Sequence, residues 1–188
     1  IVRYVARAPQ NASTTINAAN GTLTNEAGEY YVEKTYTFAQ KYNYEECSFT
    51  LAGYTFDCWN NGGSNCAAGA EFENLANTQG AVIEVYTVWT ANKVTVKFNA
   101  EGVVSSQTYT FDQAGEYVAD PSRKGYTFEG YSREQNAQTA TYTTAGRTIA
   151  AATVNELYSY ATNSNAAAAE ITLYAVWTAN KFVVNFDL

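Results

Sequence analysis

Gly-Tyr-Thr-Phe occurs at residues 53–56 and again at 125–128, and Val-Trp-Thr-Ala-Asn-Lys occurs at 88–93 and again at 176–181. The two words recur in the same order, which composition alone would not produce. A fixed internal repeat of this kind determines how the rest of a chain should be interpreted. The sequence therefore predicts two tandem copies of one folding unit.

The repeat divides the 188 residues into three parts. Residues 1–92 form the first repeat, with an extra N-terminal strand at residues 1–8, and residues 93–180 form the second. Residues 181–188 copy the sequence at 93–100 and are predicted to be the opening strand of a third copy. Units of this size can build a thin but workable core.

Between the repeated words, apolar and polar residues alternate with the period of two that is typical of half-buried strands. The clearest example is residues 81–90, which are dense in the β-branched and aromatic residues that favour strands. The copies differ most between residues 145 and 171, where Val154, Leu157 and Tyr158 have helical spacing and indicate a short helix at 153–160. The predicted fold class is mainly β, a small α+β fold with at most short helices.

The aromatic residues of the repeated words are the predicted structural core of the repeat. They are Tyr54, Phe56, Trp59, Trp89, Tyr126, Phe128 and Trp177. Their recurrence at matching positions favours packing over binding. The alternative is that exposed rings stack on sugars or on partner proteins.

The three cysteines, Cys47, Cys58 and Cys66, all lie in the first repeat. If residues 61–63 form the tip of a hairpin, Cys58 lies opposite Cys66, close enough for a disulfide in an oxidising compartment. The alternative is three buried free thiols. The role of Cys47 is left open.

Composition argues against several functions. The net charge is −7, whereas nucleic acids and anionic membrane surfaces require a basic face. The absence of His excludes Ser-His and Cys-His nucleophiles, and the scattered carboxylates form no pair that the repeat preserves. No apolar run is long enough for a membrane span. We therefore expect no catalytic residues, no metal site and no cofactor.

Taken together, the repeated words resemble the Listeria–Bacteroides repeat, the B-repeat of internalin-type surface proteins. The resemblance includes the aromatic three residues after Gly-Tyr-Thr-Phe, at Trp59 and Tyr131, and covers the chain beyond about Ser13. It implies two tandem β-grasp-like units from an exported bacterial protein. The first copy departs from the family pattern at Cys58, where the second has Gly130.

The apolar strand at residues 181–188 has three interpretations. It opens a third copy in an array cut at an arbitrary place, it folds back onto the second repeat, or it is donated to a neighbouring chain. In the last case Phe182, Val184 and Phe186 would enter the partner.

These observations, with the resemblance, predict a non-catalytic segment of a secreted or cell-surface bacterial protein that acts as a stalk or an adhesive module. One alternative is a filament subunit joined by donation of residues 181–188. Another is a carbohydrate-binding module that uses exposed Tyr and Trp. The expected partners are other repeats of the same chain, copies of itself, or a host protein or glycan.

Overall fold

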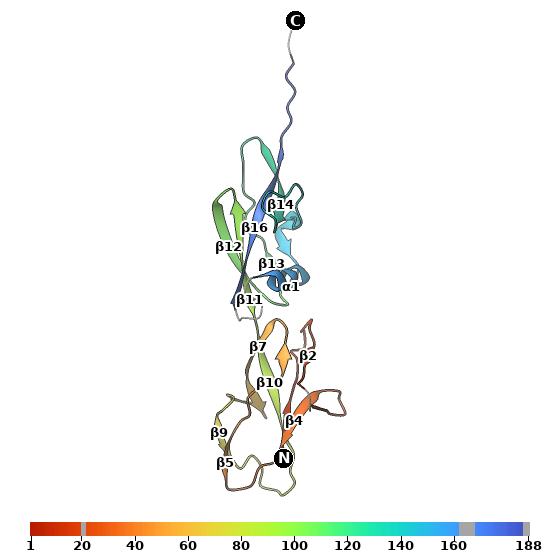
Figure 1. The fold of residues 1–188 in the computed structure, drawn as a ribbon, viewed down its shortest axis with the longest axis vertical. Helices are drawn as coiled ribbons and strands as arrows, with labels where there is room; N and C mark the ends of the chain where they lie inside the picture. The colour runs from red at the N-terminus through yellow and green to blue at the C-terminus, as the bar shows by residue number, and fades with distance from the viewer. Residues whose placement is uncertain (20–21, 162–167, 186–188) are drawn as a thin grey trace. The chain divides into compact units, whose positions relative to one another are not determined.

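The computed structural model describes residues 1–19, 22–161 and 168–185. The chain divides into two compact units, Ile1–Asn92 and Lys93–Leu188 (Figure 1). Strands dominate both units, and the described residues contain one α-helix, so the predicted mainly β class is confirmed.

The first unit is built on a sheet of six strands in the order β3-β4-β1-β10-β7-β8. These strands are β1 (Val2–Val5), β3 (Leu23–Thr24), β4 (Tyr30–Lys34), β7 (Tyr54–Asn61), β8 (Ser64–Cys66) and β10 (Ile83–Ala91). Two small ladders lie outside the sheet: β2 (Ile16–Asn17) pairs with β6 (Thr50–Leu51), and β5 (Lys41–Asn43) pairs with β9 (Glu71–Glu73).

The second unit has a sheet of four strands in the order β12-β11-β16-β14. These strands are β11 (Lys93–Ala100), β12 (Val103–Thr110), β14 (Tyr126–Ser132) and β16 (Ala168–Ala179). A two-stranded ladder joins β13 (Gly115–Glu116) to β15 (Thr148–Ile149), which follows the short 3₁₀ helix η1 (Ala145–Arg147). The helix α1 (Ala151–Tyr160) contacts the two central strands, β11 and β16.

The two units share one sheet arrangement. In each, the opening strand lies parallel to the closing strand at the centre of the sheet: β1 beside β10, and β11 beside β16 (Figure 1). An antiparallel partner flanks the opening strand, and the Gly-Tyr-Thr-Phe strand flanks the closing one. The repeated words therefore lie on neighbouring antiparallel strands in both units.

This arrangement corrects the interpretation of the N-terminal strand. Val2–Val5 was expected to be an addition in front of the first repeat, but β1 occupies the position in its sheet that β11 occupies in the second. The register supports the match, because Val2 pairs with Ile83 and Val96 pairs with Ile171. The first unit thus begins with its own opening strand, whose similarity to β11 the sequence hides.

The core of the second unit lies between the sheet and α1. Val154 and Leu157 of the helix are fully buried, as are Val96 and Leu173 of the central strands. The helix starts two residues before the predicted 153–160, and Ala150 at its N-cap makes no side-chain hydrogen bond. Burial of its apolar face, rather than capping, therefore stabilises this helix.

In the first unit irregular chain replaces the helix. Tyr44, Phe49 and Phe72 are buried against Tyr4 and Trp59, in the same core cluster as Val85. Aromatic rings thus fill the space beside the sheet. The Trp59 indole N–H donates to the carbonyl of Glu45 at 2.8 Å, which ties this segment to the sheet.

The described part of the third-copy segment, residues 181–185, forms no strand. Phe182 and Val183 are 86% and 87% exposed, and Val184 is 58% exposed. For these residues the fold-back onto the second unit is therefore wrong. Phe186 lies outside the described residues.

Candidate functional site

The repeated words meet in a small polar contact that we call the Asn clasp, formed by Gly53, Thr55 and Asn92 in the first unit. The Asn92 backbone N–H donates to the carbonyl of Gly53 at 2.8 Å. The Thr55 hydroxyl donates to Asn92 Oδ1 at 2.6 Å. Asn92 is only 3% exposed, so these bonds satisfy a polar residue that would otherwise be costly to bury.

The second unit repeats the Asn clasp with Gly125, Thr127 and Asn180. The Asn180 backbone N–H donates to the carbonyl of Gly125 at 2.9 Å, and the Thr127 hydroxyl donates to Asn180 Oδ1 at 2.7 Å. Gly53 and Gly125 have φ angles of +81° and +80°, which favour glycine. The clasp explains why Gly-Tyr-Thr and Thr-Ala-Asn recur together, although here Asn180 is exposed.

A triad of aromatic rings on β7 and β10 packs near the clasp. In the first unit Phe56 contacts Trp59, with ring centroids 5.0 Å apart, and Trp89, at 5.9 Å. The strand register shifts between Val88 and Trp89, which marks a β-bulge. Bulges of this kind redirect side chains along a strand.

The same triad recurs on β14 and β16. Phe128 contacts Tyr131 at 5.0 Å and Trp177 at 5.4 Å, and the register shifts between Phe128 and Gly130. Ring packing of this geometry adds stabilisation beyond area burial. The triad, like the clasp, is therefore a structural element that both units need.

The predicted core residues differ in burial. Trp59 is 1% exposed and lies in the core. Five others are half-buried: Tyr54, Phe56, Trp89, Phe128 and Trp177. Tyr126 was expected in the core but is 37% exposed, because it lies on an edge strand with the guanidinium of Arg123 over its ring at 3.6 Å.

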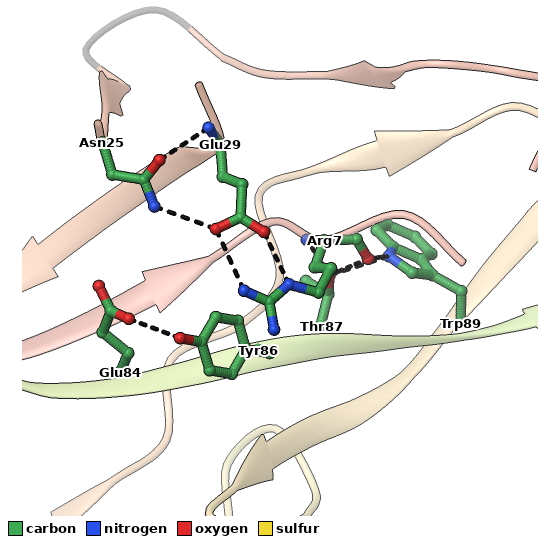
Figure 2. Close-up of polar contacts among 7 residues, drawn as sticks. All are labelled: Arg7, Asn25, Glu29, Glu84, Tyr86, Thr87 and Trp89. Carbon is green, nitrogen blue, oxygen red and sulfur yellow. Dashed lines mark hydrogen bonds and ion pairs between the residues drawn. The ribbon is translucent and has the colours of Figure 1, made fainter. Parts of the chain in front are cut away.

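A polar cluster that the sequence did not predict surrounds Arg7, just after β1 (Figure 2). Its guanidinium forms a two-pronged ion pair with Glu29, at 2.6 and 3.2 Å, and Asn25 donates a further bond to the same carboxylate at 3.0 Å. The guanidinium also lies 3.8 Å from the centre of the Tyr86 ring. The Tyr86 hydroxyl in turn donates to Glu84.

The main chain of Arg7 is held as firmly as its side chain (Figure 2). Its N–H donates to the Thr87 hydroxyl at 2.8 Å, and its carbonyl accepts from the indole N–H of Trp89 at 3.1 Å. The same indole N–H lies 2.9 Å from the Thr87 oxygen. The cluster therefore fixes the chain that leaves β1 against the closing strand.

The Arg7 cluster shifts the titration of its members. The hydrogen bond from Arg7, assisted by one from Asn25, holds the pKa of Glu29 below its ordinary value, although desolvation opposes this. The hydrogen bond to Glu84 raises the pKa of Tyr86. The Glu29 shift thus follows from an ion pair and the Tyr86 shift from a hydrogen bond to a carboxylate, and both contacts belong to the structural cluster.

The second unit lacks this support. The residue at the Thr87 position is Ala175, and in the parallel register Glu101 stands where the first unit has Arg7. Glu101 is instead paired with Arg123 at 2.7 Å. The buried indole nitrogen of Trp177 consequently has no hydrogen-bond partner among the described residues.

The prediction of a Cys58–Cys66 disulfide is wrong in this structure, where all three cysteines are free. The hairpin turns through Gly62 and Gly63 alone, with φ angles of +56° and +97°, so that Cys66 pairs with Trp59. A slip of one residue places Cys58 on the opposite face of the sheet. Burial raises the pKa of the Cys47 thiol to about 11, which disfavours its reactive thiolate.

A metal-binding cluster and a membrane-spanning helix are both absent from the described residues. No three His, Cys, Asp or Glu side chains there lie close enough together to hold a metal ion. None of the helices there has the length and apolar character that crossing a membrane requires.

A comparison with known protein families bears on the second unit. Residues 95–155 match the family model of the Listeria-Bacteroides repeat domain. The match lies within the second unit and agrees with the resemblance that the repeated words predict. The family is generally non-catalytic, and its repeats are modules of bacterial surface proteins. The matched residues include most of β11, all of β12 and β14, and the first half of α1, and they end before β16. The first unit lies outside them.

Proposed function

We propose that this chain is a non-catalytic tandem-repeat segment of an exported bacterial surface protein, in which the units act as a spacer that carries adhesive parts. Three observations support this: the family match of the second unit, the shared sheet arrangement of both, and the Asn clasp that ends each. The clasp carries the proposal, because a spacer needs a defined joint.

The joint between the units is a single residue. β10 ends at Ala91 and β11 begins at Lys93, so Asn92 alone separates the two strands. The clasp fixes the backbone and the side chain of Asn92 to Gly53 and Thr55. A link of one residue leaves little free chain between neighbouring repeats, and this short link supports the proposal of a stiff array.

The rotational diffusion of the two units tests the proposal. ¹⁵N relaxation of the whole chain should give both units one common anisotropic tumbling time. Insertion of Gly-Gly-Ser-Gly between Asn92 and Lys93 should let them tumble separately, and Asn92→Ala should fall between these limits. Independent tumbling of the unaltered chain would contradict a spacer role.

A second candidate function is a filament joined by strand donation, which the exposure of Phe182 and Val183 favours. The central place for an opening strand is already filled in both units, by β1 and β11. A donated strand would thus have to add to an edge, such as β12, where Val103 and Val104 are 75% and 52% exposed.

Light scattering separates the two candidates. A filament subunit should form concentration-dependent assemblies that disappear when residues 181–188 are deleted. A chain that stays monomeric in both forms would contradict donation and leave the spacer proposal standing.

A further inference from the structure

The first unit has a counterpart of the ladder that leads into α1. In the second unit β15 pairs with β13 and continues into α1, and in the first unit β9 pairs with β5. β5 and β13 each follow the word Tyr-Thr-Phe, at residues 36–38 and 109–111. After β9, however, residues 74–82 run to β10 without forming a helix. The first unit therefore has a loop at the position in the chain where the second has α1.

One hydrogen bond shows that this loop and α1 also occupy matching places in space. The Ala39 backbone N–H donates to Asn74 Oδ1 at 2.6 Å, and the Asp112 backbone N–H donates to Asn155 Oδ1 at 2.8 Å. Ala39 and Asp112 each follow the Phe of the Tyr-Thr-Phe word, and their φ angles are +58° and +60°. Asn74 of the loop thus makes the contact that Asn155 of α1 makes.

The two units differ in what covers the Phe of that word. In the second unit Phe111 is 5% exposed, and its ring packs edge-on against Tyr158 of α1 with the ring centroids 5.3 Å apart. In the first unit the matching Phe38 is 62% exposed. The loop at residues 74–82 contains no aromatic residue. It therefore supplies the Asn contact of α1 but no counterpart of the Tyr158 ring.

A hollow of about 380 Å³ lies beside Phe38, wholly within the first unit. Its walls come from the start of the two central strands, from the β5–β9 ladder and from the loop after β9. The large apolar and aromatic side chains in this lining include Val2, Phe38, Tyr42, Phe72, Leu75 and Ile83. The volume falls in the range of pockets that bury a small ligand.

Every side chain that lines the hollow is uncharged. The phenol groups in the lining already have partners in the same unit: the Tyr36 hydroxyl lies 2.9 Å from that of Tyr4, and the Tyr42 hydroxyl accepts from the Thr37 N–H at 3.1 Å. A charged group would lose its hydration here without gaining an ionic partner. An aromatic ring could instead pack against Phe38 and bury apolar area. The lining therefore favours an uncharged aromatic group.

We propose that this hollow receives an aromatic side chain from a helix of a partner protein, in the way that Phe111 receives Tyr158 from α1. The second unit supports a helix as the occupant, since Tyr158 is presented there together with the buried Val154 and Leu157. Apolar anchors at such spacing are how amphipathic helices bind grooves. The spacer role requires no partner at this place, so the inference goes beyond it and is independent of the joint at Asn92.

A peptide with the sequence of residues 150–161 and blocked ends is the probe, added to the whole chain. In ¹H–¹⁵N spectra the amide signals of Phe38, Leu75 and Ile83 should shift saturably. The same peptide with Tyr158→Ala should bind about tenfold more weakly, because it lacks the ring that fills the hollow.

Two variants of the chain locate the binding site. Phe38→Ser removes the exposed ring beside the hollow and should weaken binding of the peptide about tenfold. Val103→Ser is the matched control, because it removes an exposed apolar side chain that does not line the hollow, and it should leave binding unchanged. Well-dispersed spectra would show that both variants fold. Equal loss of binding in both would overturn the inference.

Four further outcomes would overturn it: no saturable shift, shifts confined to the second unit, equal binding of the two peptides, or free p-cresol binding as tightly as the peptide. The last would mean that the hollow takes a small molecule instead of a helix. Concentration-dependent shifts of the same signals without peptide would indicate a second copy as the occupant, and would also overturn it. None of these outcomes alters the common tumbling expected of a spacer.

Discussion

The indoles of Trp89 and Trp177 occupy matching places in their closing strands but differ in what their N–H groups meet. The first donates to Arg7 and Thr87, and the second has no partner among the described residues. Thr87 stands where the second unit has Ala175, so one of the two acceptors of Trp89 has no counterpart there. At the residue scale, both copies therefore keep a tryptophan at this position but differ in the polar groups around its N–H.

Thr87→Ala should destabilise the first unit by about 1–3 kcal/mol, because it leaves the Arg7 N–H and part of the Trp89 N–H without an acceptor. The reverse change, Ala175→Thr, should stabilise the second unit by about 0.5–1.5 kcal/mol. Urea unfolding, followed by amide signals of each unit, measures both. Small changes of equal size in the unfolding free energies of both variants would contradict a stabilising role for either hydroxyl.

Glu29→Gln should reduce the acid sensitivity of the first unit. The folded pKa of Glu29 is lowered by Arg7, so its contribution is present above the ordinary pKa of about 4.3 and is lost as pH falls through the folded pKa. The difference in unfolding free energy between the wild type and the variant should thus shrink between pH 7 and pH 3.

The matched control for this measurement is Glu26→Gln. Glu26 lies on the same hairpin, and the described residues include no ion-pair partner for it. A pH dependence that both variants change equally would contradict the role of the Arg7–Glu29 pair.

At the scale of elements, the Gly-Tyr-Thr-Phe strand pairs with the closing strand in the same way in both units, although the residues around it differ. In the first unit β7 has Cys58 after the bulge, and in the second β14 has Gly130. Gly130 has a φ of +130°, and a Cβ there would lie 2.4 Å from the carbonyl oxygen of Tyr142. The Tyr131–Tyr142 bridge brings that chain close to β14.

Gly130→Ala should therefore destabilise the second unit by about 3 kcal/mol or more, from backbone strain and the clash together. Gly125→Ala is the matched control, because Gly125 also has a positive φ but nothing lies within 4 Å of its added Cβ. Thermal unfolding of the second unit should show the larger loss for Gly130→Ala. Equal losses would mean that strain alone acts.

At the scale of the whole molecule, the chain contains one structural plan at two places and the sequence of its opening strand at a third. Residues 181–188 copy the opening strand, yet Phe182, Val183 and Val184 are exposed. The matching Val94 and Val96 are fully buried, because β12 and β16 flank them and α1 lies against β11. We propose that residues 181–185 need the remainder of a third unit to become a strand.

Adding residues 101–180 after Leu188 should supply that remainder. In the extended chain the amides of Phe182 and Val184 should become protected from hydrogen exchange, whereas in the 188-residue chain they should exchange like a free peptide. Phe182→Asp with Val184→Asp should abolish the protection. Protection in the 188-residue chain itself would instead indicate pairing with another molecule.

Several features were predictable from the sequence because they depend on local pattern. Alternation along residues 81–90 predicted β10, and helical spacing of Val154, Leu157 and Tyr158 predicted α1 to within two residues. The recurring words predicted that Gly-Tyr-Thr and Thr-Ala-Asn serve the same purpose in both copies. The repetition of Thr and Asn was also the available signal for the Asn clasp.

What only the tertiary structure decided depends on register and on contacts between distant residues. A turn of two residues rather than three placed Cys66 opposite Trp59 and removed the expected disulfide. The Arg7 cluster joins residues up to 82 positions apart, and no local pattern encodes that contact. The lack of a partner for the buried N–H of Trp177 among the described residues likewise became visible only in the structure, because the Arg7 acceptor of the matching Trp89 lies 82 positions away in the sequence. Sequence periodicity specifies which face of a strand is buried, whereas its partners depend on how the strands are brought together.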